Sequence, residues 1–140
     1  MDILALTLRQ GSVYYMQDRR LTSAEPHFFI VLNHAPLDDR VILLAVSTSQ
    51  VESLKLRRRD MPPESVVELS PADYPEFTKP SAVDCGSLFE MTVAELRERL
   101  RMKRAHPRQD LPAVAVEALI RGVLASPLVA PAHKRLVRPS

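Results

Sequence analysis

The apolar residues of this chain change their spacing near residue 91. Before that point they form short runs separated by polar turns, over residues 11–17, 27–33, 41–49, 65–69 and 81–89. Runs of this length, rich in Val, Ile and Phe and bounded by turn residues, are typical of buried β-strands. The pattern therefore predicts five strands in the first two thirds of the chain.

From residue 92 the apolar spacing becomes helical. Residues 92–95 (TVAE) fit a capping box, in which the Thr hydroxyl and the Glu carboxylate each satisfy a backbone N–H at the start of a helix. Apolar residues at 93, 96 and 100 form a stripe, and Pro107 is expected to end this helix. A second helix can begin near Pro112, because the apolar residues 116, 119, 120, 123 and 124 share one face. We predict one or two helices after the strands.

The length of 140 residues fits one domain. Twelve prolines against three glycines argue against a long-helix bundle, because proline interrupts helices and strands. We therefore predict a mainly β (α+β) fold over residues 1–125. Residues 126–140 contain three prolines and several basic residues, and we assign them to a basic, Pro-rich tail.

The charge balance of 19 basic and 17 acidic residues is too even to indicate a polyanionic partner by itself. Any contact with a polyanion would have to come from local clusters of basic residues. Cys85 is the one cysteine, which excludes an internal disulfide and a thiolate-rich metal site. We predict no metal, no cofactor and a reducing, cytoplasmic location. No signal peptide or membrane-length apolar stretch stands out in the sequence, so no membrane association is expected.

Four strings, in order, carry a resemblance to a known family. They are GSVYY at 11–15, EPHFFIVL at 25–32, TSQ at 48–50 and TKPSAVD at 78–84. Together they resemble the PemK/MazF toxins of toxin–antitoxin systems, over roughly residues 11–100. The resemblance implies a small SH3-like five-stranded barrel with C-terminal helices that forms a homodimer. It also implies an endoribonuclease that cleaves single-stranded RNA without a metal and is neutralised by an acidic antitoxin protein.

The resemblance implies a catalytic pair, an Arg before the proline of the second string and the first Thr of the third. Thr48 matches the Thr, whereas Glu25 stands where the Arg is implied. A guanidinium would stabilise charge on a reacting phosphate, and a carboxylate would repel it. Strand alternation places His27 on the same side as Glu25, and a histidine suits proton transfer. The catalytic candidates are therefore Thr48, His27 and Glu25.

Seven further residues are candidates for holding RNA. Hydroxyl and cationic groups suit phosphate contact, and the resemblance places the loops after the first and third strands beside the RNA. The RNA-binding candidates are Ser49, Lys79, Arg19 and Arg20, with Arg57, Arg58 and Arg59 in the expected loop after the third strand.

Three other interpretations fit the same residues. The substitution at Glu25 fits a barrel that has lost catalysis and serves as a protein- or nucleic-acid-binding module. A structural dimer whose basic helix binds an acidic partner is another possibility. Purely structural roles also suit the candidates: His27 as a strand residue, and Arg57–Arg59 as a solvated run balanced by Asp60 and Glu64.

Overall fold

The computed structural model describes residues 2–139. The first half contains α1 (Ile3–Thr7), β1 (Val13–Met16), β2 (His27–Val31), β3 (Val41–Thr48), α2 (Val51–Arg57), the 3₁₀ turn η1 (Pro63–Ser65) and β4 (Val66–Leu69). The second half contains β5 (Ser81–Asp84), β6 (Phe89–Thr92), α3 (Val93–Arg101), β7 (Ala105–Arg108), α4 (Ala113–Ala125) and α5 (Pro131–Leu136). The mainly β, α+β class predicted from the sequence is confirmed.

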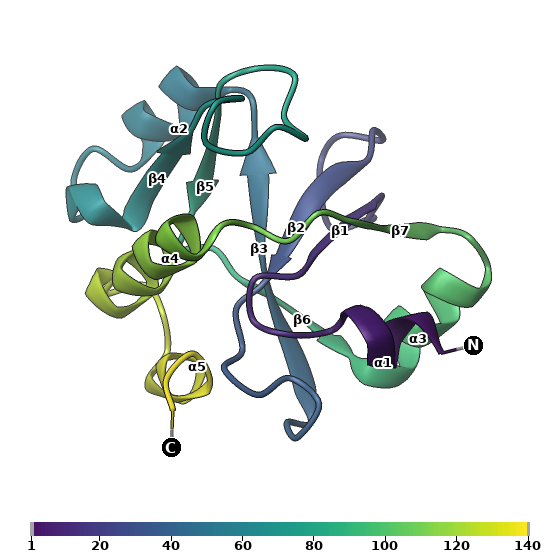
Figure 1. Cartoon of the computed structure of the whole chain (residues 1–140). Coiled ribbons are helices and arrows are strands. Elements are labelled where there is room, and N and C mark those ends of the chain that lie inside the picture. The colour runs from purple at the N-terminus through teal and green to yellow at the C-terminus, as the bar shows by residue number, and fades with distance from the viewer. Residues whose placement is uncertain (1, 140) are drawn as a thin grey trace.

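The strands form one antiparallel sheet built around β3 (Figure 1). One edge of β3 pairs with β2, followed by β1 and β7. The other edge pairs with β6 over Val41–Leu44 and with β5 over Ser47–Thr48, and β4 lies beyond β5. Of the residues described, β4 and β7 form the outer strands and do not pair with each other, so the sheet is open.

The expectation of a closed, five-stranded barrel was therefore wrong: residues 2–139 contain seven strands. The segment 81–89 forms two strands instead of one. Its backbone turns after Asp84, whose carboxylate accepts a hydrogen bond from the Gly86 N–H at 3.0 Å. This turn lets β5 and β6 pair with successive parts of the same edge of β3.

The additional strand β7 follows α3. Helix α3 begins with Thr92, whose hydroxyl accepts the Glu95 N–H at 3.0 Å as the capping box predicts. The helix ends before Pro107, and Lys103 then adopts a left-handed conformation with φ of 58°. Residues 105–108 pair with β1 as an outer strand, where a proline without an N–H is tolerated.

The sheet is buried on both faces, because successive residues of the central strands enter different cores. In β3, Leu43 and Ala45 face α4 and α5, whereas Ile42 and Leu44 face α1 and α3. Figure 1 shows these helix pairs on opposite sides of the sheet. Two-sided burial explains why the strands contain continuous apolar runs instead of alternating ones.

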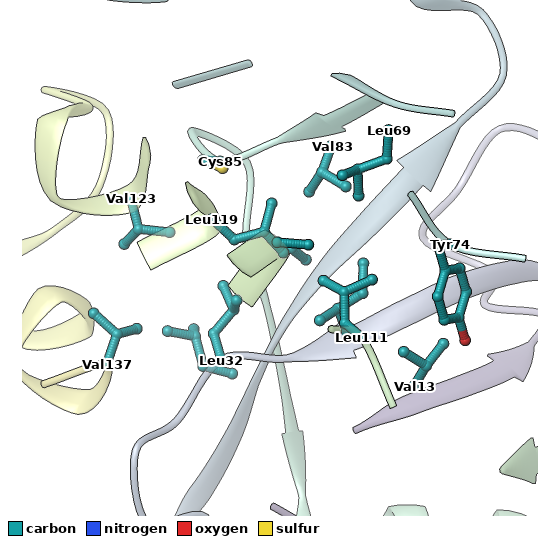
Figure 2. Close-up of a cluster of buried hydrophobic side chains, with 14 of the residues drawn as sticks. Val13, Leu32, Leu69, Tyr74, Val83, Cys85, Leu111, Leu119, Val123 and Val137 are labelled. Atoms are coloured by element: carbon teal, nitrogen blue, oxygen red, sulfur yellow. The ribbon is translucent and has the colours of Figure 1, made fainter. Parts of the chain in front are cut away.

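Helix α4 closes the first of these cores. Leu119 and Val123 belong to the same buried cluster as Val83 of β5 and Cys85, which follows that strand (Figure 2). The contact is close at Gly122, where an added Cβ would lie 2.5 Å from the Glu64 carbonyl oxygen and 2.8 Å from the Cys85 sulfur. Only glycine fits this position without a shift of the backbone.

Segment 126–139, which composition assigns to a basic tail, packs on the same core. Val129 and Val137 are buried, and Val137 lies near Leu32 in Figure 2. The Gln10 side chain donates to the carbonyl oxygens of Leu32, at 2.8 Å, and Val137, at 3.1 Å. The His133 ring lies 2.5 Å from the Glu90 carboxylate of β6.

A buried carboxylate organises the loop between β1 and β2. The side chain of Asp18 is 1% exposed and accepts hydrogen bonds from Arg20, at 2.9 and 3.0 Å, and from Arg99 of α3, at 3.2 Å. The hydrogen bonds from Arg20 lower the pKa of Asp18 from 3.8 to about 2. The loop is thereby held against α3.

None of the helices within residues 2–139 combines the length and the apolar composition needed to cross a bilayer.

Asp18→Asn should lower the free energy of unfolding by about 2 kcal/mol at pH 7, measured by urea denaturation. The native pKa of about 2 lies below the unfolded value, so the ionised carboxylate stabilises the fold fully above about pH 4. This stabilisation is lost as the pH falls from about 4 to about 2, and the two proteins should converge there. Asp38→Asn, at an exposed site, serves as the control. Equal losses in both variants would contradict the role of Asp18.

Gly122→Ala should destabilise the protein by about 2 kcal/mol or more, because the added methyl group meets backbone and sulfur atoms. A Gly-to-Ala change in a solvent-exposed helix would stabilise the protein by up to about 1 kcal/mol, so the sign of the change in unfolding free energy tests the close packing at Gly122. Thermal or urea unfolding measures the effect, with the exposed Arg121→Ala as the control on the same helix. A stabilised Gly122→Ala protein would contradict the close contact between α4 and η1.

Candidate functional site

A polar pocket of about 230 Å³ lies at the end of β3. The β1–β2 loop, the start of β2, the end of β3, α2 and the turn between β5 and β6 meet around it. Its lining is rich in hydroxyl groups and comprises Leu21, Thr22, Ser23, His27, Val46, Ser47, Thr48, Gln50, Ser53, Leu54, Arg57, Asp84, Ser87 and Phe89.

Helix α2 forms one wall of the pocket. The sequence suggests a loop here, and that expectation was wrong: residues 51–57 are helical. Leu54 is buried beneath the helix and lines the pocket together with Gln50, Ser53 and Arg57. These positions follow the spacing of one helical face, which is the sequence signal that identifies Gln50 and Ser53 as lining residues.

Thr48, the last residue of β3, lines the pocket and is partly exposed. Its hydroxyl oxygen accepts the Gln50 N–H at 3.1 Å. This hydrogen bond uses a lone pair of the oxygen and leaves the hydroxyl proton free to donate to a ligand. Thr48 therefore offers a hydroxyl hydrogen-bond donor just before the start of α2.

His27, the first residue of β2, lines the same pocket. Its Nδ1 lies 3.0 Å from the backbone carbonyl oxygen of Glu25. Because a carbonyl oxygen only accepts, this contact assigns the ring proton to Nδ1. In the neutral ring Nε2 then carries the lone pair, which is the form that a general base requires.

Glu25 contacts the candidate site only through its backbone, whose carbonyl oxygen lies next to the His27 ring. Its side chain is exposed and is not part of the pocket lining among the residues described. Its carbonyl oxygen orients His27, and its N–H donates to the Ser23 hydroxyl at 3.1 Å. The carboxylate therefore does not occupy the position of a group that acts on a phosphate.

The three consecutive arginines have different surroundings because they lie at the end of a helix. Arg57 lines the pocket and forms no ion pair within residues 2–139. Arg58 is 24% exposed and its Nε binds the Asp84 carboxylate at 3.0 Å. Arg59 donates to the Leu56 carbonyl oxygen at 2.9 Å and is not among the lining residues that the structure describes. Of the three arginines, Arg57 is thus the one that lines the pocket within residues 2–139.

The remaining four candidates are outside the lining of this pocket in residues 2–139. Ser49 and Lys79 are exposed, and Ser47 lines the pocket next to Thr48 instead of Ser49. Arg19 lines a different hollow, beside α3. Arg20 binds Asp18, donates to the Glu90 carbonyl oxygen at 3.0 Å and stacks on the Phe89 ring at 5.1 Å.

A larger hollow of about 880 Å³ lies between β1, α3 and β7. Its lining contains both signs of charge: Arg19, Arg99, Lys103 and Arg104 on one side of the balance, and Asp18, Glu95 and Glu98 on the other. Of the candidate residues, Arg19 alone is in its described lining, whereas His27, Thr48 and Arg57 line the smaller pocket.

Two kinds of catalytic site are not found in the described part of the chain. No group of three or more His, Cys, Asp and Glu side chains there lies close enough together to hold a metal ion. Cys85 is fully buried, and burial raises the pKa of its thiol to about 12. A thiol with that pKa carries almost no thiolate near neutral pH and is a poor nucleophile.

No protein-family model matches the chain, and a search of curated proteins found no match. The candidate site therefore rests on the geometry of its own residues.

Proposed function

We propose that this protein is a metal-independent endoribonuclease that cleaves single-stranded RNA in the pocket beside α2. One observation carries the proposal: His27, Thr48 and Arg57 come from three different elements and line one polar pocket. They supply a base, a hydroxyl donor and a cation, which are the groups that cleavage by an RNA 2′-hydroxyl requires.

The reaction begins with His27. Its Nε2 takes the proton of the ribose 2′-hydroxyl, and the 2′-oxygen attacks the adjacent phosphorus. The bond from phosphorus to the 5′-oxygen breaks, and the leaving oxygen takes a proton from solvent water. The products are a 2′,3′-cyclic phosphate and a free 5′-hydroxyl. The Glu25 carbonyl oxygen holds the starting ring with its proton on Nδ1, and after the cleavage Nε2 returns its proton to the hydroxide left by that water.

Thr48 and Arg57 act on the phosphate. The Thr48 hydroxyl donates to a non-bridging oxygen, and the Arg57 guanidinium stabilises the negative charge that grows on the phosphorus centre. Arg57 therefore supplies, from α2, the cation that the family resemblance implies at position 25. The exposed carboxylate of Glu25 is compatible with this arrangement because it lies outside the pocket lining.

The resemblance to PemK/MazF toxins supports the biological context. We propose that the protein is the toxin component of a toxin–antitoxin pair, acts in the cytoplasm as a homodimer and is neutralised by an acidic antitoxin.

Glu25 favours a second candidate function, a binding module without catalysis. A carboxylate replaces the Arg that the resemblance implies, and His27 is the one histidine among the pocket's described lining residues. In that case the pocket binds a nucleic-acid or protein ligand and leaves it intact.

Purified protein should cleave labelled single-stranded RNA in the presence of EDTA. His27→Ala should lower the rate about a hundredfold or more, because a positioned base contributes about 10² to 10⁴. Thr48→Val should lower it about tenfold or more by removing one hydrogen-bond donor. Gel analysis of the products measures both rates and identifies the cyclic phosphate.

The control for Thr48→Val is Thr78→Val, which makes the same change at an exposed site outside the described pocket lining. Wild-type protein that binds RNA with a steep salt dependence and never cleaves it supports the binding module instead. Absence of both binding and cleavage would overturn the endoribonuclease and the nucleic-acid-binding module.

Arg57→Ala should lower the cleavage rate about a hundredfold, whereas Arg59→Ala should leave it within about threefold. The two variants remove the same charge from neighbouring residues, but the described lining of the pocket includes Arg57 and not Arg59. Single-turnover rates at fixed ionic strength separate this effect from a general loss of positive charge. Equal effects from both would show that the triplet acts only through net charge.

A further inference from the structure

Asp84 is an acidic group in a pocket that we propose binds a polyanion. It lies at the end of β5, its side chain is 12% exposed, and it lines the pocket together with Thr48 and Arg57. A carboxylate repels phosphate, so a phosphate-binding role does not explain its presence there.

Asp84 is fixed in place by two hydrogen bonds. Its Oδ1 accepts the Gly86 N–H at 3.0 Å, and its Oδ2 accepts the Arg58 Nε–H at 3.0 Å. Each oxygen of a carboxylate has two acceptor sites, so each keeps one for a ligand. The Arg58 guanidinium offsets the negative charge without using up these acceptors.

A rigid pair of acceptors selects a ligand that offers two adjacent donors. On the base-pairing edge of guanine the N1–H and the N2 amino group lie side by side and match both oxygens. Cytosine presents one amino group next to an acceptor nitrogen. Adenine likewise presents one amino group, and uracil presents a single N–H between two carbonyl groups. Guanine is the base that fits this arrangement best.

The other walls suit a nucleobase that has left the stack. Phe89 and Leu21 provide apolar surface, and the Phe89 ring is held from behind by Phe29, with ring centroids 6.2 Å apart. Arg20 lies 5.1 Å from the Phe89 ring centroid and limits its movement further. A pocket of about 230 Å³ is smaller than typical pockets for drug-sized ligands and suits a single nucleobase better than a whole nucleotide.

We propose that Asp84 is a specificity-determining residue that selects a guanine nucleotide in the RNA next to the cleaved bond. The proposal rests on the proposed function, because it assumes that RNA enters the pocket. Arg58 is a positioning residue that orients the carboxylate.

The first test uses wild-type protein and short oligonucleotides U-U-X-U-U with 2′-fluorine at every sugar, which removes the nucleophile and leaves binding intact. Affinity is measured by fluorescence anisotropy. Guanine at X should bind about tenfold or more tightly than adenine or uracil. Inosine, which lacks the N2 amino group, should lose most of this preference, and 7-deazaguanine, which keeps both donors, should retain it.

The second test uses Asp84→Asn with the cleavable RNA series. The ratio of the cleavage rate with guanine at X to the rate with adenine at X should fall about tenfold, because the substitution replaces one acceptor oxygen with an amide donor. A proton-transfer role for Asp84 would instead lower kcat equally for every base. Asp60→Asn makes the same charge change at an exposed site outside the described lining and is the control. Thermal unfolding verifies that the variants are folded.

The outcomes separate this inference from the proposed function. Cleavage without any base preference, or a preference that Asp84→Asn leaves unchanged, overturns the role of Asp84 and leaves the nuclease intact. Guanine-selective binding without cleavage overturns the nuclease and supports Asp84 as the specificity residue of a binding module. Absence of RNA binding overturns both.

Discussion

Burial of β3 on both faces is the constraint on which the rest of the structure depends. Leu43 and Ala45 need cover from α4 and α5, and Ile42 and Leu44 need it from α1 and α3. The strand is long enough to pair with β2 on one edge and with β6 and then β5 on the other. Its last two residues, Ser47 and Thr48, are polar, and they line the pocket at the point where the apolar run ends. The position of the pocket thus follows from where the apolar part of β3 ends.

Charge in the site is arranged by local geometry more than by composition. The helix at residues 51–57 separates three adjacent arginines, so that Arg57 faces the pocket and Arg58 holds Asp84. The loop opposite is fixed by Asp18, whose carboxylate binds Arg20 and Arg99. Arg20 in turn lies on the Phe89 ring that forms part of the wall. A buried carboxylate outside the lining therefore determines how firmly one side of the pocket is held.

Much of the secondary structure is visible in the sequence, because short apolar runs and the capping box at Thr92 are local signals. Two of the misjudged segments have conformations that depend on distant partners. Residues 105–108 become a strand only because β1 offers an unpaired edge, which no local pattern reports. The run 81–89 breaks after Asp84 because both halves pair with β3, and a continuous strand would extend past it. Helix α2 is different: the helical spacing of Gln50, Ser53 and Arg57 was a local signal, but the basic triplet Arg57–Arg59 at the end of the helix obscured it.

The sequence by itself determined the class of the fold, the central strands, the starts of α3 and α4 and the residue types available for chemistry, since these follow from apolar spacing and side-chain identity. Only the tertiary structure decided which candidates meet. His27, Thr48 and Arg57 line one pocket. Arg20 instead forms an ion pair with Asp18. Ser49 and Lys79 lie outside the pocket lining that residues 2–139 form. Glu25 contributes its carbonyl oxygen instead of its carboxylate. Pairing partners and side-chain direction arise from contacts between residues far apart in the chain, and the order of residues alone does not encode those distances.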